Sequence, residues 1–419
     1  MKGNTPQSEK KAAVKTRSLP TKLRTRPQTA VNETFLTASK WLRVAKYITA
    51  FVLVAFALVM TTLCRDSITL DNFRYLARYL DVGSSYSGFS DDFATLNYTS
   101  DSQNTLAFYR NDIVISNSVG LRIKSTTDKD IYQNDLYYTD PVLLTGERYM
   151  LCYDLGGTSY SLHNTFASVY SANTQYAITD GALSDSGVFA LVTGSSQYRS
   201  EVTVYDADFK AMCSVKKDKM IIDVSLSDEG DKLLVLSCGT ADGAFFTEIL
   251  LCDTKTGETD YSETFTGIMA VSASIWPDGS FTVLSDQGIL FYDSYYNQRA
   301  NYTFTTLPSS FCMQNGFIAV AVSHNLVGGD STVTVLDTEG NTVRSAQITG
   351  KIVRMACQEN AVCVLTSDKL YRISFADTDI QYCEVSSSCT DLLLCPKNGA
   401  YICYASQAVY LDFSQCFNR

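Results

Sequence analysis

The stretch WPDGSFTVLSDQGILFYD, residues Trp276–Asp293, decides the fold of this chain. Its short apolar runs are interrupted twice, at Asp278-Gly279 and at Ser285–Gly288. Glycine and aspartate between apolar runs are typical of tight turns that join two strands. A calcium loop is the alternative, but it requires oxygen ligands at alternate positions, and no Asp-x-Asp-x-Asp-Gly run occurs. The stretch therefore predicts hairpins rather than an ion site.

The same pattern of strand, turn and strand recurs eight times downstream of residue 90. We take the equivalent turn positions to be Asn104, Gly146, Gly187, Gly230, Gly279, Gly316, Asn360 and Gly399. Their spacings of 42, 41, 43, 49, 37, 44 and 39 residues define one repeat. In most repeats a later strand ends in an aspartate that can accept hydrogen bonds from the backbone two residues on. These aspartates are Asp206, Asp253, Asp293, Asp337 and Asp412.

Repeats of this length, with short strands and glycine or asparagine turns, predict an all-β fold. Four strands per repeat are what a propeller blade needs, and stacking neighbouring blades in a ring buries the apolar face of each. We expect a β-propeller of about eight four-stranded blades over residues 85–419, with seven as the alternative. The last repeat lacks an obvious fourth strand, so the segment before residue 93 could close the ring by pairing with it.

Charge divides the chain into a basic arm and an acidic body. Residues 1–46 contain eleven Lys or Arg and two acidic residues, whereas the chain after Cys64 contains 23 basic and 42 acidic residues. Because phosphate binding relies on clustered Lys and Arg, the acidic body should not bind nucleic acid. Residues 1–46 have too few apolar residues to form a core, so we expect a disordered basic tail that is attracted to anionic lipid headgroups.

Residues 47–64, YITAFVLVAFALVMTTLC, contain no charged residue. A helix of that length spans roughly 27 Å, close to the hydrocarbon thickness of a bilayer. We expect an uncleaved transmembrane helix; a buried helix of a soluble protein is the alternative. The basic residues before it predict a single-pass protein of the cell membrane with a cytoplasmic N-terminus and an extracytoplasmic C-terminal domain. Leu70, Phe73, Leu76 and Leu80 then predict a juxtamembrane stalk helix within residues 65–84, or a continuation of the membrane helix.

The sequence offers little catalytic or metal-binding chemistry. Only two histidines, His163 and His324, occur, and they lie in different repeats, so a multi-histidine metal site is excluded. No nucleophile elbow and no outstanding carboxylate pair is present. Neither metal nor cofactor is therefore expected. Most cysteines lie inside strands as small apolar residues, but Cys357 with Cys363, and Cys395 with Cys403, could pair in an oxidising compartment.

A binding surface is expected where the connections lengthen. In a four-stranded blade, the turns from strand one to two and from three to four lie on one side of the ring, and the remaining connections lie on the other. The first kind is short throughout, whereas the second is extended at 193–201, 237–246 and 323–331. Loops that lengthen on a rigid scaffold often carry recognition residues. The candidates are Tyr198, Arg199, Phe245, Phe246 and His324; alternatively, Phe245 and Phe246 begin the next strand and pack.

Residues 149–164 and 182–215 resemble an uncharacterised, domain-of-unknown-function family of single-pass membrane-anchored bacterial β-propellers of clostridial type. The basic tail, the apolar segment and the repeats match that layout, and the resemblance implies fold and location only. The repeats are also broadly similar to quinoprotein-like and WD40-like propellers. Trp276 is the only tryptophan after the apolar segment, so the repeated tryptophan docking of quinoprotein blades is absent and no quinone cofactor is expected.

Two function classes remain open at this point. The first is a binding or scaffolding module for an extracytoplasmic protein, a peptide or a cell-envelope glycan. The second is a polysaccharide-acting hydrolase or lyase with its site in the propeller channel, which would need convergent charged side chains on the inner strands. The inner-strand candidates 221–227 and 269–275 are mainly small and apolar, which favours binding.

Overall fold

The computed structural model describes residues 28–63, 93–100, 104–241, 243–324, 329–377, 379–396 and 398–417. The chain divides into two compact units, residues 1–77 and 78–419. In the first unit, α1 (Gln28–Leu63) is the described element. It includes residues 28–46, for which the sequence predicts a disordered tail, and the structure describes them as helical. Among the described residues, no helix combines the length and the apolar character needed to cross a membrane. Cys64, the last residue of the predicted span, lies outside the described residues, as does the predicted stalk at 65–84.

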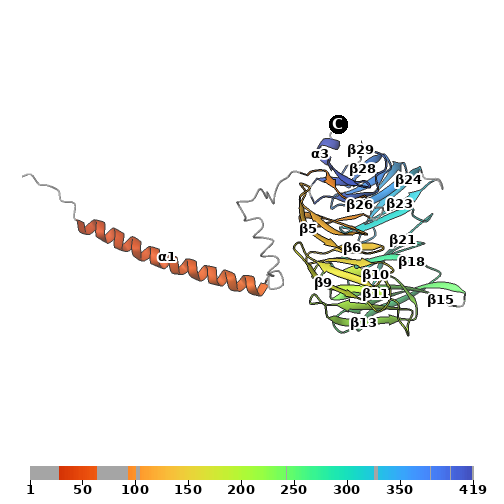
Figure 1. Ribbon diagram of the computed structural model, residues 1–419, viewed down its shortest axis with the longest axis horizontal. Coiled ribbons are helices and arrows are strands. Elements are labelled where there is room, and N and C mark those ends of the chain that lie inside the picture. The colour runs from red at the N-terminus through yellow and green to blue at the C-terminus, as the bar shows by residue number, and fades with distance from the viewer. Residues whose placement is uncertain are drawn as a thin grey trace, which may run out of the picture. The chain divides into compact units, whose positions relative to one another are not determined.

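The second unit is a ring of eight four-stranded antiparallel sheets (Figure 1). Blades 1 to 4 comprise β2 (Thr105–Tyr109), β3 (Asp112–Asn117), β4 (Gly120–Lys124) and β5 (Asp130–Asp135); β6 (Pro141–Thr145), β7 (Met150–Asp154), β8 (Ser159–His163) and β9 (Ser168–Asn173); β10 (Ile178–Leu183), β11 (Phe189–Thr193), β12 (Ser200–Tyr205) and β13 (Ala211–Lys217); and β14 (Met220–Leu226), β15 (Lys232–Ala241), β16 (Ala244–Asp253) and β17 (Thr259–Thr266).

Blades 5 to 8 complete the ring, and the chain then ends in a short helix. They comprise β18 (Ala270–Ile275), β19 (Phe281–Ser285), β20 (Gly288–Tyr292) and β21 (Gln298–Thr303); β22 (Ser310–Gln314), β23 (Phe317–Ser323), β24 (Asp330–Asp337) and β25 (Thr342–Thr349); β26 (Ile352–Cys357), β27 (Ala361–Thr366), β28 (Lys369–Ser374) and β29 (Ile380–Glu384); and β30 (Asp391–Leu394), β31 (Gly399–Cys403), β32 (Gln407–Asp412) and β1 (Leu96–Asn97), followed by α3 (Phe413–Cys416). Eight blades are confirmed, and the alternative of seven is wrong.

The core lies between the blades rather than inside one sheet. Each of the eight clusters of buried apolar side chains joins two neighbouring blades, from blades 1 and 2 around to blades 8 and 1. First strands of neighbouring blades contact each other, as β14 does with β10 and with β18, so these strands line the centre of the ring. This arrangement follows from the sequence, because a single blade leaves an apolar face that only the next blade can cover.

The ring closes in blade 8, where β1 supplies the fourth strand. Leu96 pairs with Ala408 and Asn97 with Gln407, and Leu96 is fully buried. In Figure 1 the blue strands of the last blades accordingly lie beside the orange strands of the first blade. Closure by an N-terminal segment was expected, but the segment is 96–97 rather than one before residue 93. The marker at Asn104 was also misplaced, because the first turn of blade 1 lies at residues 110–111.

The connections of the ring form two opposite surfaces, because successive strands in each blade are antiparallel. We call the first surface the tight rim; its described turns are 110–111, 125–129, 146–149, 164–167, 184–188, 206–210, 227–231, 254–258, 276–280, 293–297, 315–316, 338–341, 358–360, 375–377 with 379, and 395–396 with 398. We call the second the loop face; its described connections are 98–100 with 104, 118–119, 136–140, 155–158, 174–177, 194–199, 218–219, 243, 267–269, 286–287, 304–309, 324 with 329, 350–351, 367–368, 385–390 and 404–406.

Candidate binding face

Exposed apolar side chains gather on the loop face. Outside α1, twelve large apolar side chains are exposed among the described residues. Two of them lie elsewhere: Tyr295 is on the tight rim and Tyr382 is on an outer strand. The other ten lie in the loop face or within two residues of it: Val119, Tyr137, Leu155, Tyr198, Met220, Phe245, Met269, Val271, Leu307 and Phe311. Scattered exposed apolar residues are normal on a protein surface, so what distinguishes this set is its position on one side of the ring.

The exposed group is densest over blades 3 to 6. Met220, Val271 and Phe311 lie at the beginning of three first strands, so they surround part of the channel mouth. Their side chains are exposed because each inner strand begins at the loop face, where the neighbouring blades no longer cover it. Sequence analysis did not find these residues. Each of them continues the apolar pattern of a strand, and that pattern does not show which strand residues the neighbouring blades leave exposed.

Tyr198 and Arg199 lie where the sequence placed them, on the connection from β11 to β12. Both side chains are exposed. The Lys216 ammonium lies 5.9 Å from the centre of the Tyr198 ring, and Lys216 also pairs with Glu201. The pair therefore lies on a loop-face connection, and its role in binding stays a prediction.

Phe245 and Phe246 do not lie on a loop. Residues 237–246, predicted as an extended loop, form the end of a long hairpin in which β15 and β16 pair continuously from Lys232↔Asp253 to Ala241↔Ala244. The two strands project beyond the other sheets in Figure 1. The alternative that both phenylalanines begin the next strand is therefore correct, but its second part, that they pack, holds for Phe246 only. Phe245 is 61% exposed, whereas the Phe246 ring is half-buried against Gly239.

A charged network joins blades 3 and 4 beside these aromatic residues. Lys217 and Lys219 pair with the two carboxylate oxygens of Glu248 at 3.0 and 2.8 Å. The Lys219 ammonium also lies 4.7 Å from the centre of the Phe246 ring. Burial alone would raise the pKa of Glu248, but the hydrogen bonds from Lys219 and Lys217 lower it overall. The network fixes the base of the hairpin against blade 3 and keeps Phe245 projecting from a rigid support.

His324 is not part of this group. It is exposed on the connection from β23 to β24, where its Nε2 lies 2.7 Å from Thr332 Oγ1. Its blade is two positions along the ring from the blade of Phe245. The structure therefore brings Tyr198, Arg199 and the two phenylalanines onto neighbouring blades and leaves His324 apart.

A polar belt lies deeper in the channel wall, and sequence analysis missed it. Asp180 Oδ2 accepts a hydrogen bond from the Val224 N–H at 3.1 Å. Asp223 Oδ2 accepts hydrogen bonds from Ser272 Oγ at 2.8 Å and from the Ala273 N–H at 2.7 Å. Each carboxylate thus reaches from one inner strand to the next blade. On the opposite part of the ring, Arg354 pairs with Asp391 at 3.2 Å.

The carboxylate of Asp223 is close enough to affect the ionisation of Asp180. Burial, and then repulsion from Asp223, raise the pKa of Asp180 to about 7. Burial also raises the pKa of Asp223. Each aspartate follows a bulge after the first strand residues, as Ser272 and Arg354 do in their own blades. A polar residue at the same position in several first strands could have revealed this belt from the sequence. Recognising it requires knowledge of where each first strand begins.

A cleft of about 490 Å³ opens between blades 7 and 8 at the loop face. Residues 385–388 and 404–407 form its rim, and Ile402, Val409 and Leu411 form its apolar wall. Among the described residues, no group of three or more His, Cys, Asp or Glu side chains is arranged to hold a metal ion.

The chain has relatives in family and in fold. Residues 89–410 match a family of unknown function, DUF5711. Among solved structures, BamB from Moraxella catarrhalis is similar with a TM-score of 0.50 and 12% identity, covering 75% of this chain and 96% of that one. The Dos1 propeller has the same TM-score and identity, with 65% and 80% covered. No curated protein matches. At these identities the solved structures support the propeller fold alone.

Proposed function

The chain belongs to the family of unknown function DUF5711, and we propose that its propeller is a binding module that holds a protein partner on the loop face. The observation that carries this proposal is the one-sided set of exposed apolar side chains. Burying them against a partner would contribute roughly 25 cal/mol per Å² of apolar surface before the costs of association are subtracted. On the opposite surface, the tight rim, Tyr295 is the one exposed large apolar side chain among the described residues.

The chemistry of the face favours a protein over a glycan. Its exposed residues over blades 3 to 6 are mostly aliphatic or thioether side chains, such as Met220, Met269 and Leu307, which bury well against apolar side chains of a partner. Tyr198 and Phe245 add aromatic anchors at the outer part of the face. The acidic balance of the chain after Cys64, 23 basic against 42 acidic residues, favours a partner whose surface is basic.

We also propose that the module is held at the outer side of a cell membrane. The support is the sequence of residues 47–64, which carries no charge, and the excess of basic residues before it. Within α1, the described apolar side chains Tyr47, Phe51 and Leu53 are exposed by 73%, 74% and 61%. Protease added to intact cells should then degrade the propeller and spare the N-terminal segment; a protected propeller would contradict this location. The clostridial type implied by the resemblance stays a prediction.

An enzyme in the channel is the second candidate, because Asp180 and Asp223 place two interacting carboxylates there. Their hydrogen bonds to the neighbouring blades already occupy one oxygen of each, which supports a structural role instead. We expect the protein to release no fragments from cell-envelope polysaccharide. Fragment release that is abolished by Asp223→Asn would support the enzyme and contradict the binding module as the main function.

Photo-crosslinking in the native host tests the binding face. Phe245 is replaced by a photoreactive phenylalanine analogue, and Tyr295 on the tight rim is replaced in a matched control. Irradiation should give a protease-sensitive adduct heavier than the 46.2 kDa chain from position 245 and none from position 295. An adduct removed by glycan hydrolases would identify a glycan partner instead. Equal adducts from both positions, or none from 245, would overturn the proposal.

A second variant separates binding from folding. Replacing Tyr198 and Arg199 together by alanine should reduce the yield of the adduct formed from position 245, because both side chains lie on the neighbouring blade of the same face. Since both are exposed, the free energy of unfolding should change by no more than about 0.5 kcal/mol. An unchanged adduct yield would move the partner contact away from blade 3.

A further inference from the structure

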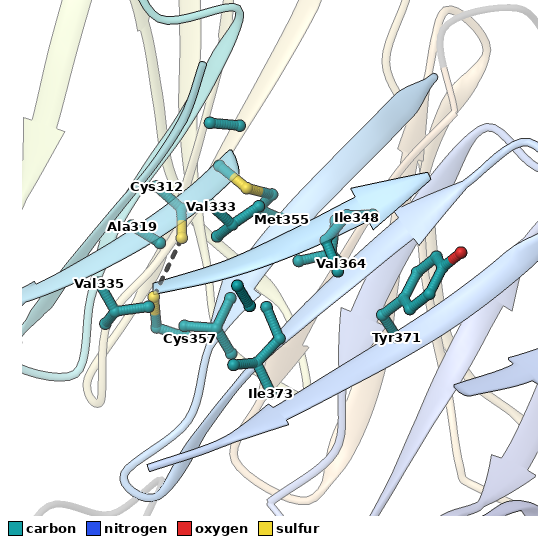
Figure 2. Close-up of a cluster of buried hydrophobic side chains, with 13 residues drawn as sticks. Cys312, Ala319, Val333, Val335, Ile348, Met355, Cys357, Val364, Tyr371 and Ile373 are labelled. Carbon is teal, nitrogen blue, oxygen red and sulfur yellow. Dashed lines mark hydrogen bonds between the residues drawn. The ribbon is translucent and has the colours of Figure 1, made fainter. Parts of the chain in front are cut away.

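Two buried thiols meet across the junction between blades 6 and 7. Cys312 on β22 and Cys357 on β26 place their sulfur atoms 3.0 Å apart (Figure 2). Their residues are 8% and 1% exposed, and the apolar cluster of this junction surrounds them. An approach of only about 1 Å would bring the sulfurs to the S–S bond length of ~2.05 Å. The expected pairing of Cys357 with Cys363 is not what the structure brings together, and every described cysteine is a free thiol.

Backbone contacts hold the two thiols in register. The Cys357 N–H donates to Gln314 Oε1 at 3.3 Å, and Asn315 Nδ2 donates to the Cys357 carbonyl at 2.7 Å. Both partners come from the end of β22 and the turn that follows it, so blade 6 holds the backbone of Cys357 on both sides. The arrangement of the two blades therefore brings the side chains together, and only a small movement of the sulfurs is needed to form a bond.

We propose that Cys312 and Cys357 form an inter-blade disulfide when the protein meets a small-molecule disulfide oxidant. One protein thiolate attacks a sulfur of the oxidant and releases one small thiol; the second protein thiolate then attacks the mixed disulfide and releases the other. The two protein thiols lose two protons and two electrons in total, and the oxidant is reduced to two thiols. The hydrogen bond with Cys312 and burial raise the pKa of Cys357, so the reaction should be slow at neutral pH and faster at higher pH.

The bond would link residues 45 positions apart and would close a loop that contains most of blade 6. Such a link restricts the unfolded chain and adds a covalent tie at an internal junction of the ring. Blade 8, by contrast, is closed by the two-residue strand β1. Oxidation would therefore stabilise the junction between blades 6 and 7.

The test uses the full chain, oxidised glutathione and peptide mapping. The oxidised protein should lose the mass of two hydrogen atoms and yield a cross-linked peptide joining Cys312 to Cys357. Its melting temperature should rise by about 5 °C over that of the reduced protein. Cys312→Ala should abolish both changes. Cys152→Ala is the matched control, because that buried thiol lies in blade 2 beside Ser116, and both changes should persist.

Direct mapping of the unsubstituted chain keeps the proposal falsifiable even where a variant folds poorly. Recovery of Cys312 and Cys357 as free thiols after prolonged oxidation at raised pH, with the chain still folded, would overturn it. So would glutathione adducts that remain on either residue, because these would show that the second attack does not occur.

Discussion

The tight rim and the loop face are built from the same eight blades, but the first consists of hydrogen-bonded turns and the second carries exposed apolar side chains. On the tight rim, an aspartate at the end of the third strand accepts hydrogen bonds from the turn: Asp337 Oδ1 accepts from the N–H groups of Glu339 and Asn341 at 3.0 and 2.8 Å. Neighbouring turns are also bonded to each other, as where the Ser186 N–H donates to the Asp228 carbonyl at 3.1 Å. The loop face instead carries exposed apolar residues and the projecting β15–β16 hairpin. We therefore expect substitutions on the tight rim to change stability more than substitutions on the loop face.

The largest expected effect on stability is a difference between alanine substitutions at two glycines with similar φ angles. Gly230 on the tight rim has φ +72°, and an added Cβ would lie 2.5 Å from Val188 Cβ of the preceding blade. Gly243 at the end of the hairpin has φ +80° and nothing within 4 Å. Gly230→Ala should cost about 3 kcal/mol, from backbone strain and steric overlap, whereas Gly243→Ala should cost about 1 kcal/mol from strain alone. Urea unfolding of both variants measures the difference; equal costs would contradict the contrast between the surfaces.

The next effect concerns acid and His163, which ends β8 beside the tight rim. The ring is fully buried and lies 2.8 Å from Ser161 Oγ, and burial lowers its pKa from 6.5 to about 4. A lowered pKa means that its contribution to stability is present above pH 6.5 and is lost as the pH falls towards 4. That loss should amount to about 2–3 kcal/mol. His163→Gln should flatten the dependence in this range, as measured by unfolding at each pH; an unchanged slope would show that His163 does not cause it.

The smallest effect has the opposite sign and belongs to Asp180, just inside the loop face. Because its pKa is raised from 3.8 to about 7, the folded state binds the proton more tightly than the unfolded state. The stabilising contribution is therefore complete below pH 3.8 and is lost as the pH rises to 7. After allowance for solvent near the channel, Asp180→Asn should raise stability at pH 8 by about 1 kcal/mol and leave it unchanged at pH 4. A loss of stability at pH 8 would show that the ionised carboxylate is needed there.

Local patterns predicted most of the rim. The aspartates Asp206, Asp253, Asp293 and Asp337 all accept hydrogen bonds from backbone N–H groups two residues on, as the repeat predicted. In blade 8 the equivalent Asp412 likewise accepts a hydrogen bond from the Ser414 N–H two residues on, and there it also caps α3. These predictions succeeded because a turn is defined by residues next to one another in the chain. Asn104 failed as a marker because the residues before it belong to the last blade, which local sequence does not reveal.

The candidate site was predicted less well. Tyr198 and Arg199 lie on a connection between strands, as predicted, because a long polar connection is visible in the sequence. The prediction of an extended loop at 237–246 was wrong, because two strands continue there past the edge of the sheet. Asp180 and Asp223 were missed because they lie 43 residues apart in the chain, and only the ring brings their strands together.

The sequence by itself determined the repeat, the four-stranded blade and the positions of most tight turns, because periodicity and turn chemistry act over a few residues. The tertiary structure decided how many blades close the ring, which N-terminal residues complete blade 8, which thiols meet and which apolar side chains remain exposed. These properties depend on contacts between residues far apart in the chain, such as Leu96 with Ala408 and Cys312 with Cys357. They are fixed only when neighbouring blades bury each other's apolar faces.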